Sequence, residues 1–177
     1  MSAGGAHVLV VGGSGMLARL CRRLAGEGWL VSVVGREPGK LALVAVGFER
    51  VHPISVDYQD LERFRAELAG ARRRLGPILL AVLWVRSWAP QSLLAAAEEV
   101  APDGRIVRVV GSSASAASEE AAETIRRRFG SGYQEVRLGS VATSAGRRWL
   151  TDAEISDGVH RAIERGAGDV LVGDTTS

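Results

Sequence analysis

The stretch His7–Ala18, HVLVVGGSGMLA, decides the fold of this 177-residue chain. Its apolar run from Val8 to Val11 predicts a strand that is buried on both faces. Glycines follow at once, and from Leu17 apolar residues recur at the spacing of one helix face. A strand joined to a helix by a tight glycine-rich turn is the first unit expected of a sheet built from strand–helix–strand repeats.

Strand-like and helix-like segments alternate along the rest of the chain. Short β-rich apolar runs predict the strands, and longer stretches with apolar residues three or four positions apart predict the helices. Thr151 and Glu154 form a capping box, which marks the start of the last helix. The predicted strands are 7–11, 29–34, 50–56, 77–85, 105–110, 133–138 and a possible short one at 169–172; the predicted helices are 17–26, 60–70, 90–100, 118–129 and 151–164.

This alternation, with connections of a few residues, predicts an α/β fold with a parallel sheet. Right-handed crossovers give a doubly wound sheet of the Rossmann type, in the order 3-2-1-4-5-6 with a possible seventh strand. No linker or internal repeat divides the chain, so residues 1–177 are expected to form one nucleotide-binding domain. In such sheets a ligand binds at the carboxyl ends of the strands, near the switch point between the first and fourth.

Composition excludes several classes of protein. Hydrophobic residues make up 46% and charged residues 24%, which argues against a disordered chain. A single cysteine, Cys21, excludes an intrachain disulfide and a cysteine-based zinc site, and no metal is expected. No apolar run is long enough to span a membrane, and the N-terminus lacks the pattern of a secretory signal, so we expect a cytoplasmic protein.

The basic residues are almost all arginine. Lysine and arginine together number 22, and Lys40 is the only lysine. Acidic residues lie close to the first two arginine-rich runs, which favours helix ends in solvent over a nucleic-acid surface. The expected partner is therefore a small molecule, with neither nucleic acid nor membrane, and a homo-oligomer is possible.

The loop after the first strand predicts a dinucleotide site. It satisfies G-x-G-x-x-A from Gly13 and G-x-x-G-x-x-A from Gly12. Between a strand and a helix, glycines let a pyrophosphate approach the backbone, and the helix N-terminus favours its charge. The alternative is a tight turn without a ligand. The residues expected to contact the cofactor here are Gly12, Gly13, Ser14, Gly15, Met16 and Leu17.

The end of the second strand favours NADP(H) over NAD(H). An NAD site usually has an acid there for the ribose hydroxyls, whereas this chain has Arg36, which can pair with a 2′-phosphate. Lys40 could add a second positive charge. The alternative is that Arg36 and the neighbouring Glu37 form an ordinary exposed ion pair.

With these features the chain resembles the short-chain dehydrogenases/reductases, in a shortened and divergent form close to the atypical and extended members. Val56-Asp57 is similar to the pair whose aspartate meets the adenine amino group in that family. The segment 139–143, GSVAT, is similar to the family's P-G-x-V-x-T, with Leu138 in place of the proline. The resemblance implies that Val141 and Thr143 contact the nicotinamide, and that the threonine forms a hydrogen bond with the carboxamide of the nicotinamide.

The same resemblance implies a catalytic serine at the end of the fifth strand, as Ser112 or Ser113. The family's Tyr-x-x-x-Lys pair is missing. Tyr133 with Arg137 has the same spacing, but positions four apart do not adjoin on the strand predicted there. Tyr133 is therefore a candidate proton donor. The alternative, which we favour, is that it is a structural residue of the strand.

Two further segments are candidates for substrate binding. After the fourth strand, Arg86 could anchor a substrate and Trp88 could form a pocket wall, unless Trp88 merely caps the core. Arg147, Arg148 and Trp149 follow the sixth strand, where the family has its substrate lid. They could recognise an acidic or planar substrate, but a solvated loop is at least equally expected.

The resemblance thus implies an NADPH-dependent reductase acting on a small carbonyl or conjugated substrate. Ser112 or Ser113 would polarise the acceptor, and water or Tyr133 would supply the proton. Because the Tyr-x-x-x-Lys pair is missing, an NADP(H)-binding sensor or scaffold without hydride chemistry stays open. So does a cyclase or isomerase on the same fold.

Overall fold

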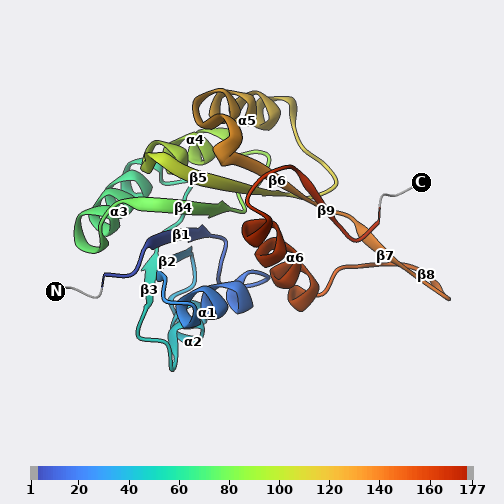
Figure 1. The fold of residues 1–177 in the computed structure, drawn as a ribbon, viewed down its shortest axis with the longest axis horizontal. Coiled ribbons are helices and arrows are strands. Elements are labelled where there is room, and N and C mark those ends of the chain that lie inside the picture. The colour runs from blue at the N-terminus through green and yellow to red at the C-terminus, as the bar shows by residue number, and fades with distance from the viewer. Residues whose placement is uncertain (1–3, 175–177) are drawn as a thin grey trace.

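The computed structural model describes residues 4–174 and contains a parallel seven-stranded sheet in the order β3-β2-β1-β4-β5-β6-β9 (Figure 1). The predicted strand order is confirmed. The possible seventh strand is also present, as β9 pairs in parallel with β6. The strands are β1 (His7–Val11), β2 (Leu30–Gly35), β3 (Val51–Ser55), β4 (Ile78–Leu83), β5 (Val100–Val110), β6 (Tyr133–Leu138) and β9 (Val170–Val172).

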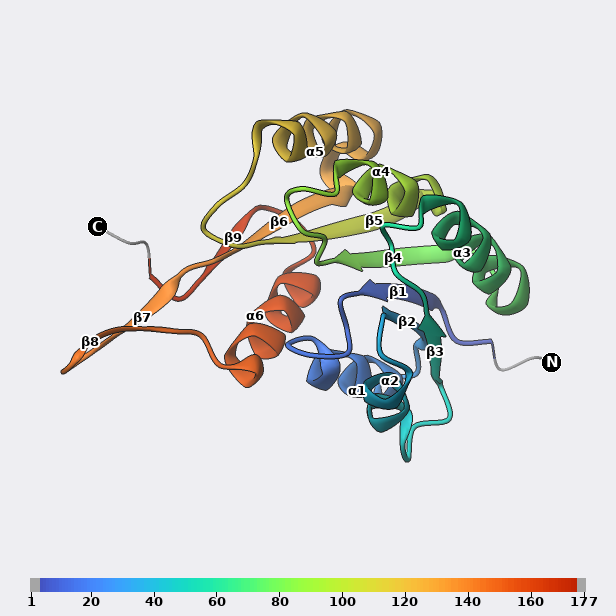
Figure 2. The same ribbon diagram turned by 180° about the vertical axis from the view of Figure 1, so that it is seen from behind.

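Helices cover both faces of the sheet. As Figures 1 and 2 show, α1, α2 and α6 lie on one face, and α3, α4 and α5 lie on the other. This is the doubly wound arrangement predicted from the alternation of strands and helices. The helices are α1 (Ala18–Gly26), α2 (Pro38–Ala45), α3 (Leu61–Leu75), α4 (Pro90–Glu98), α5 (Ala116–Phe129) and α6 (Asp152–Arg165), with a 3₁₀ turn at Gly130–Gly132.

The first strand shows why its sequence is apolar throughout. Val8 and Val10 pack into the core on the side of α1, α2 and α6, whereas Leu9 and Val11 pack into the core on the opposite side. All four side chains are fully buried. Because both faces of a central parallel strand are covered by helices, neither set of alternating positions can be polar.

Helix α2 was not predicted. Its sequence, PGKLALVA, is apolar at almost every position after Lys40, so it lacks the polar face that gives a helical period. Leu41 and Val44 are buried, while Leu43 is exposed. The Pro38 at its start fits the first turn of a helix, where no amide hydrogen bond is lost.

A two-stranded antiparallel hairpin, also not predicted, extends beyond the edge of the main sheet. It consists of β7 (Ser140–Thr143) and β8 (Gly146–Trp149), and it leads into α6 (Figure 1). The hydroxyl of Thr143 donates a hydrogen bond to the carbonyl of Gly146 at 2.9 Å, which closes the turn. The hairpin carries Trp149 beside the carboxyl ends of the strands.

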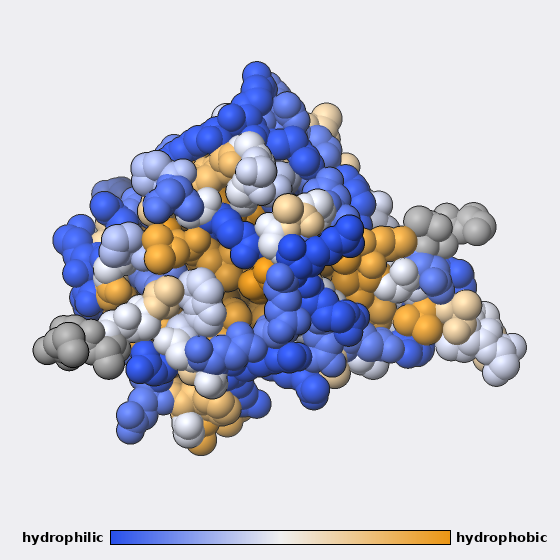
Figure 3. Space-filling model, viewed as in Figure 1, coloured by the Kyte–Doolittle hydropathy of each residue, from blue (hydrophilic) through white to orange (hydrophobic). Residues whose placement is uncertain are grey.

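Charged and polar residues cover most of the face seen in Figure 3, and hydrophobic surface appears between them in patches. Large exposed hydrophobic side chains include Leu43 and Val46 near α2, and Trp88 and Trp149 elsewhere. Among residues 4–174, no helix combines the length and the hydropathy that a membrane crossing requires.

Candidate functional site

The candidate site lies at the carboxyl ends of β1, β4 and β5, where the loops that follow these strands meet. β1 is the switch point of the sheet, because β2 leaves on one side of it and β4 lies on the other. Two adjacent cavities open there, and Met16, Trp84 and Arg86 line both of them. A ligand longer than either cavity can therefore extend across the switch point, as expected of this architecture.

The glycines of the first loop have different reasons to be glycine. Gly12 has φ +85°, and a Cβ there would lie 2.9 Å from Cδ1 of Trp84. A Cβ on Gly13 would lie 2.6 Å from Cγ2 of Val33. Both positions are therefore required by the packing of the loop itself. Gly15 differs, because a Cβ there meets nothing within 4 Å and faces open space.

The open space at Gly15 belongs to the first cavity, of about 300 Å³, which we call the phosphate-side cavity. It lies at the start of α1, whose N-cap residue Leu17 makes no side-chain cap and whose first turn has no acid. The partial positive charge of this helix end is thus left for an anion. Its lining residues are Gly12, Ser14, Gly15, Met16, Val34, Gly35, Arg36, Val56, Tyr58, Trp84 and Arg86.

A serine that sequence reasoning missed fixes this loop from a distant element. Ser156, on α6, is buried; its hydroxyl donates a hydrogen bond to the carbonyl of Met16 at 2.7 Å and accepts one from the amide of Leu20 at 3.3 Å. The loop and the first turn of α1 are thereby held together. No local pattern indicates this role, because 140 residues separate Ser156 from Met16.

Arg36 follows β2 at the rim of the phosphate-side cavity. Its side chain is exposed, and within residues 4–174 no acid pairs with it. The alternative of an Arg36–Glu37 ion pair is not what the structure shows, since Glu37 pairs with Lys40 at 2.7 Å. Arg36 is thus available to an anionic group, whereas the charge of Lys40 is already compensated.

Asp57 lies near the phosphate-side cavity but does not line it. Its neighbours Val56 and Tyr58 line the cavity and Asp57 does not. One carboxylate oxygen of Asp57 accepts a hydrogen bond from the amide of Gln59 at 2.9 Å, as in a turn that closes on its own side chain. The adenine contact implied by the family resemblance stays a prediction.

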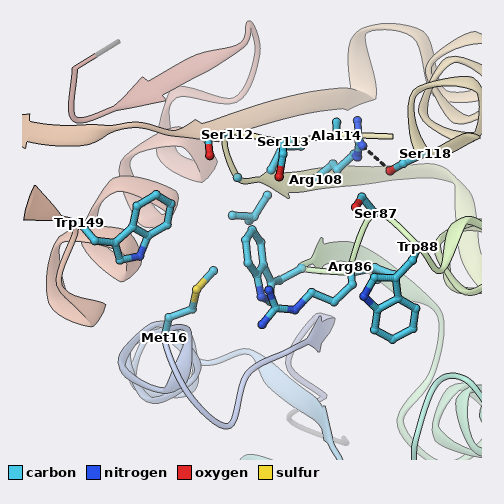
Figure 4. A pocket seen from close by; sticks show the side chains of 15 residues that line it. Met16, Arg86, Ser87, Trp88, Arg108, Ser112, Ser113, Ala114, Ser118 and Trp149 are labelled. Carbon is cyan, nitrogen blue, oxygen red and sulfur yellow. Dashed lines mark hydrogen bonds between the residues drawn. The ribbon is translucent and has the colours of Figure 1, made fainter. Parts of the chain in front are cut away.

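The second cavity, of about 440 Å³, contains the candidate serines, and we call it the serine-side cavity (Figure 4). Ser112 and Ser113 follow β5 and are exposed to it. Arg86 and Trp88 also line it, as predicted for the loop after β4. The full lining is Met16, Trp84, Val85, Arg86, Ser87, Trp88, Arg108, Val109, Val110, Gly111, Ser112, Ser113, Ala114, Ser118 and Trp149.

Trp84 forms the boundary between the two cavities. Its ring reaches from Gly12 to Gly111, where a Cβ would lie 3.5 Å from Cη2 of the indole. The guanidinium of Arg86 lies over this ring, 5.7 Å from the centroid. The backbone amide of Arg86 donates to the hydroxyl of Tyr58 at 3.3 Å, which ties the loop after β4 to the loop after β3.

Tyr133 does not belong to this site. It begins β6, at the end of the sheet opposite the cavities, and lines neither of them. Its buried hydroxyl donates a hydrogen bond to Glu135 at 2.8 Å. Burial, together with the charge of Glu135, raises the pKa of Tyr133 above its ordinary value. From this position Tyr133 cannot pass a proton to a substrate beside Ser112, and it serves as a strand residue.

Val141 and Thr143 lie on β7, and neither lines a cavity. The Thr143 hydroxyl is engaged with the hairpin turn. Leu138, where the family's segment would have proline, ends β6, and the chain then turns outward into the hairpin. The nicotinamide contacts that the resemblance implies for these two residues stay a prediction.

Arg108 is the second residue of the site that sequence reasoning missed. It lies in β5 among apolar residues and is 4% exposed. Its guanidinium donates to Glu119 and Glu135, both at 3.1 Å, and to the hydroxyl of Ser118 at 2.7 Å. Two carboxylates thus compensate its charge. The only sequence signal was an arginine within a strand predicted to be buried, which calls for a partner.

Comparison with known proteins agrees with this architecture. No protein-family model and no curated protein matches the sequence. A solved short-chain dehydrogenase/reductase from Serratia marcescens is similar with a TM-score of 0.73 and 17% identity, over 98% of each chain. A short-chain dehydrogenase from Oenococcus oeni also gives 0.73, with 11% identity over 97% of each chain. A variant of actinorhodin polyketide ketoreductase, solved with NADPH, gives 0.73 with 16% identity over 97% of each chain.

The chain therefore has the fold of the short-chain dehydrogenases/reductases, as the resemblance of its motifs implied. At these identities the likeness concerns the fold, and the activity has to be argued from the site itself.

Proposed function

We propose that this protein is an NADPH-dependent oxidoreductase of the short-chain type, which reduces a small carbonyl or conjugated substrate. The observation that carries the proposal is the continuity of the two cavities. They join the uncapped start of α1 and Arg36 to Ser112 and Ser113 through a shared boundary at Met16, Trp84 and Arg86. This arrangement suits a dinucleotide whose phosphates lie at one end and whose reactive ring lies at the other.

The residues of the phosphate-side cavity fit such a cofactor. Gly15 leaves open the space that a Cβ would fill, and the start of α1 offers an anion its partial positive charge. Arg36, which no acid among residues 4–174 pairs with, lies at the rim and is suited to the 2′-phosphate that distinguishes NADP(H) from NAD(H). These residues would hold the adenosine and pyrophosphate parts of NADPH.

When bound, the nicotinamide supplies a hydride to the carbonyl carbon of the substrate. Ser112 or Ser113 would donate a hydrogen bond to the carbonyl oxygen and so stabilise the negative charge that develops there. The proton that completes the alcohol would come from water, because both serines are exposed to solvent and Tyr133 lies elsewhere. Arg86 and Arg108, which also line this cavity, cannot donate the proton, since a guanidinium stays charged.

One observation favours a second candidate function, an NADP(H)-binding protein without hydride chemistry. Among residues 4–174, the ionisable side chains that line the serine-side cavity are those of Arg86 and Arg108, and neither titrates near neutral pH. A protein that senses the cofactor needs the phosphate-side cavity and no proton donor. The two candidates therefore differ in what happens beside Ser112.

Isotope transfer separates them. NADPH carrying deuterium at the transferable position is incubated with the protein and a panel of aldehydes and ketones, and deuterium in the alcohol product is measured. We expect transfer, and we expect replacing the serine that faces the substrate by alanine, in Ser112→Ala or Ser113→Ala, to lower turnover about 10²–10³-fold with nearly unchanged NADPH affinity. Ser131→Ala, in the 3₁₀ turn before β6, is the matched control.

Two outcomes would contradict the reductase. If NADPH binds but no carbonyl compound receives deuterium, and both serine variants behave as the wild type, the sensor candidate is supported. If the wild type binds no NADPH at all, both candidates fail and the glycine-rich loop is only a turn.

A further inference from the structure

We propose that the substrate of the serine-side cavity is an aromatic carbonyl compound that carries an anionic group such as a carboxylate, and that Arg86 binds this anion. The inference rests on the proposed function, because it names the substrate class of the same site. It is carried by the charges that line the cavity and by two exposed indole rings.

The charge of the cavity is positive and is concentrated on one residue. The described residues that line it include two arginines and no acidic side chain. Arg108 is buried and compensated by Glu119 and Glu135. Arg86 is exposed, and within the described part of the chain no acid pairs with it. An uncompensated guanidinium in a cleft attracts anions, and its planar fork matches a carboxylate.

Arg86 is also held in position to meet a ligand. Its backbone amide is tied to the hydroxyl of Tyr58, and its guanidinium lies over the Trp84 ring, which limits the side chain's freedom. Figure 4 shows this side chain reaching across the cavity toward Met16, with Ser112 and Ser113 on the opposite side of the opening. A substrate between them can present its carbonyl to a serine and its anion to Arg86.

The walls of the cavity account for the aromatic part of the substrate. Trp88 is 59% exposed and Trp149 is 50% exposed, although indoles of this size usually gain stability from burial. They come from distant segments, the loop after β4 and the strand β8, and they lie on opposite sides of the cavity in Figure 4. A planar ring in the cavity would cover apolar surface that otherwise faces water.

The same guanidinium borders the phosphate-side cavity, so the pyrophosphate of the cofactor is the other anion that it could bind. The two sources predict different results. An anchor for the substrate affects the affinity for an anionic substrate, whereas a clamp on the pyrophosphate affects the affinity for NADPH.

The test uses three probes on the wild-type protein saturated with NADP⁺, with dissociation constants measured by titration calorimetry. Benzoylformate has a ring, a carbonyl and a carboxylate; acetophenone lacks the carboxylate; pyruvate lacks the ring. We expect benzoylformate to bind at least about tenfold more tightly than either of the others, because only it engages both Arg86 and the indoles. NADPH affinity is measured first, as a separate check of the proposed function.

Variants separate the contribution of Arg86 to substrate binding from that of the indole rings. Arg86→Gln should abolish the advantage of benzoylformate over acetophenone and leave NADPH affinity within about twofold, whereas Arg127→Gln, which removes an exposed charge on α5, should change neither. Trp149→Ala should weaken benzoylformate and acetophenone but not pyruvate, and Trp149→Phe should restore most of the loss.

Equal affinities for the three probes in a wild type that binds NADPH would overturn this inference and leave the proposed function standing. So would an Arg86→Gln variant that loses NADPH affinity and keeps its preference for benzoylformate, since Arg86 would then serve the pyrophosphate. A wild type that binds no NADPH overturns the proposed function, and the substrate inference falls with it.

Discussion

The hydroxyl of Tyr133 donates a hydrogen bond to the carboxylate of Glu135 at 2.8 Å, and both side chains are buried at the interface of β6 and α5. Glu135 also pairs with Arg108 at 3.1 Å and with Arg137 at 2.7 Å. The guanidinium of Arg126 lies over the Tyr133 ring, 4.6 Å from its centroid. The only tyrosine with the family's spacing to a basic residue is thus part of a buried ionic network and not of the cleft.

Because of this position, the Tyr133→Phe variant tests whether Tyr133 stabilises the fold or donates a proton to the substrate. Losing one buried hydrogen bond should lower the free energy of unfolding by about 1–2 kcal/mol, measured by urea denaturation. NADPH oxidation should stay at the wild-type rate, because the ring is far from Ser112. A loss of turnover of about 10²–10⁴-fold, the range for a missing general acid, would show that Tyr133 reaches the substrate after all.

Substitutions at Gly12 and Gly15, in the same loop, should differ in their effect on stability. Gly12→Ala should destabilise the fold by about 2 kcal/mol, because φ is +85° and the new Cβ would press on Trp84. Gly15→Val should leave stability within about 0.5 kcal/mol, since nothing in the protein occupies that space. The same Gly15→Val change should abolish NADPH binding. Thermal unfolding and NADPH titration of both variants check this, and full NADPH affinity in a folded Gly15→Val protein would mean that the loop binds no pyrophosphate.

The proposed preference for NADP(H) can be tested at Arg36. Arg36→Ala should weaken NADPH binding by about 10- to 100-fold, because a charge-assisted hydrogen bond of this type contributes on the order of 1.5–3 kcal/mol. NADH lacks the 2′-phosphate, so its affinity should hardly change. Fluorescence titration with both nucleotides measures the two effects, with Lys40→Ala as the comparison at a cation already paired with Glu37. Equal losses for NADPH and NADH would contradict the assignment.

The surroundings of His7 lead us to expect that the free energy of unfolding decreases in mild acid. Its Nδ1 donates a hydrogen bond to the carbonyl of Gly76 at 2.9 Å, and its Nε2 forms a hydrogen bond with the hydroxyl of Ser32 at 2.8 Å. Burial lowers the pKa of His7 below its ordinary 6.5. Below that pH the unfolded chain binds a proton that the folded chain does not, which favours unfolding.

The contribution of His7 should therefore be complete above pH 6.5 and be lost as the pH falls toward the lowered pKa of the folded state. The free energy of unfolding, measured between pH 5 and pH 8, should fall less steeply in His7→Asn than in the wild type. The pKa of His52, also buried in part, is lowered in the same direction, so His52→Gln is the control that isolates its share. Identical slopes in wild type and His7→Asn would contradict this assignment.

Much of the site could be predicted because its signals are local. The run from His7 to Ala18 specifies a buried strand, a tight turn and a helix, and the rule of parallel sheets then places the cleft at the ends of β1 and β4. Arg36, Ser112, Ser113 and Arg86 follow the ends of strands, and the structure places all four at the two cavities. Local apolar patterns and connection lengths carried that information.

The misses have physical reasons of two kinds. Helix α2 escaped because its apolar residues follow one another without a polar face, so no helical period is visible. The hairpin β7–β8 is exposed over most of its length, and without a buried face its strands lack the alternation that marks a sheet.

The sequence by itself determined the strands of the main sheet, their order and the loop that a dinucleotide could occupy, because these depend on periodicity and on glycine at positions that permit no side chain. Only the tertiary structure decided which charges are free. The sequence does not show which arginine is paired: packing gives Arg108 two carboxylates and leaves Arg86 without one among the described residues. Glu119 and Glu135 come from α5 and β6, and only folding brings them to β5 and leaves the charge of the cleft on Arg86.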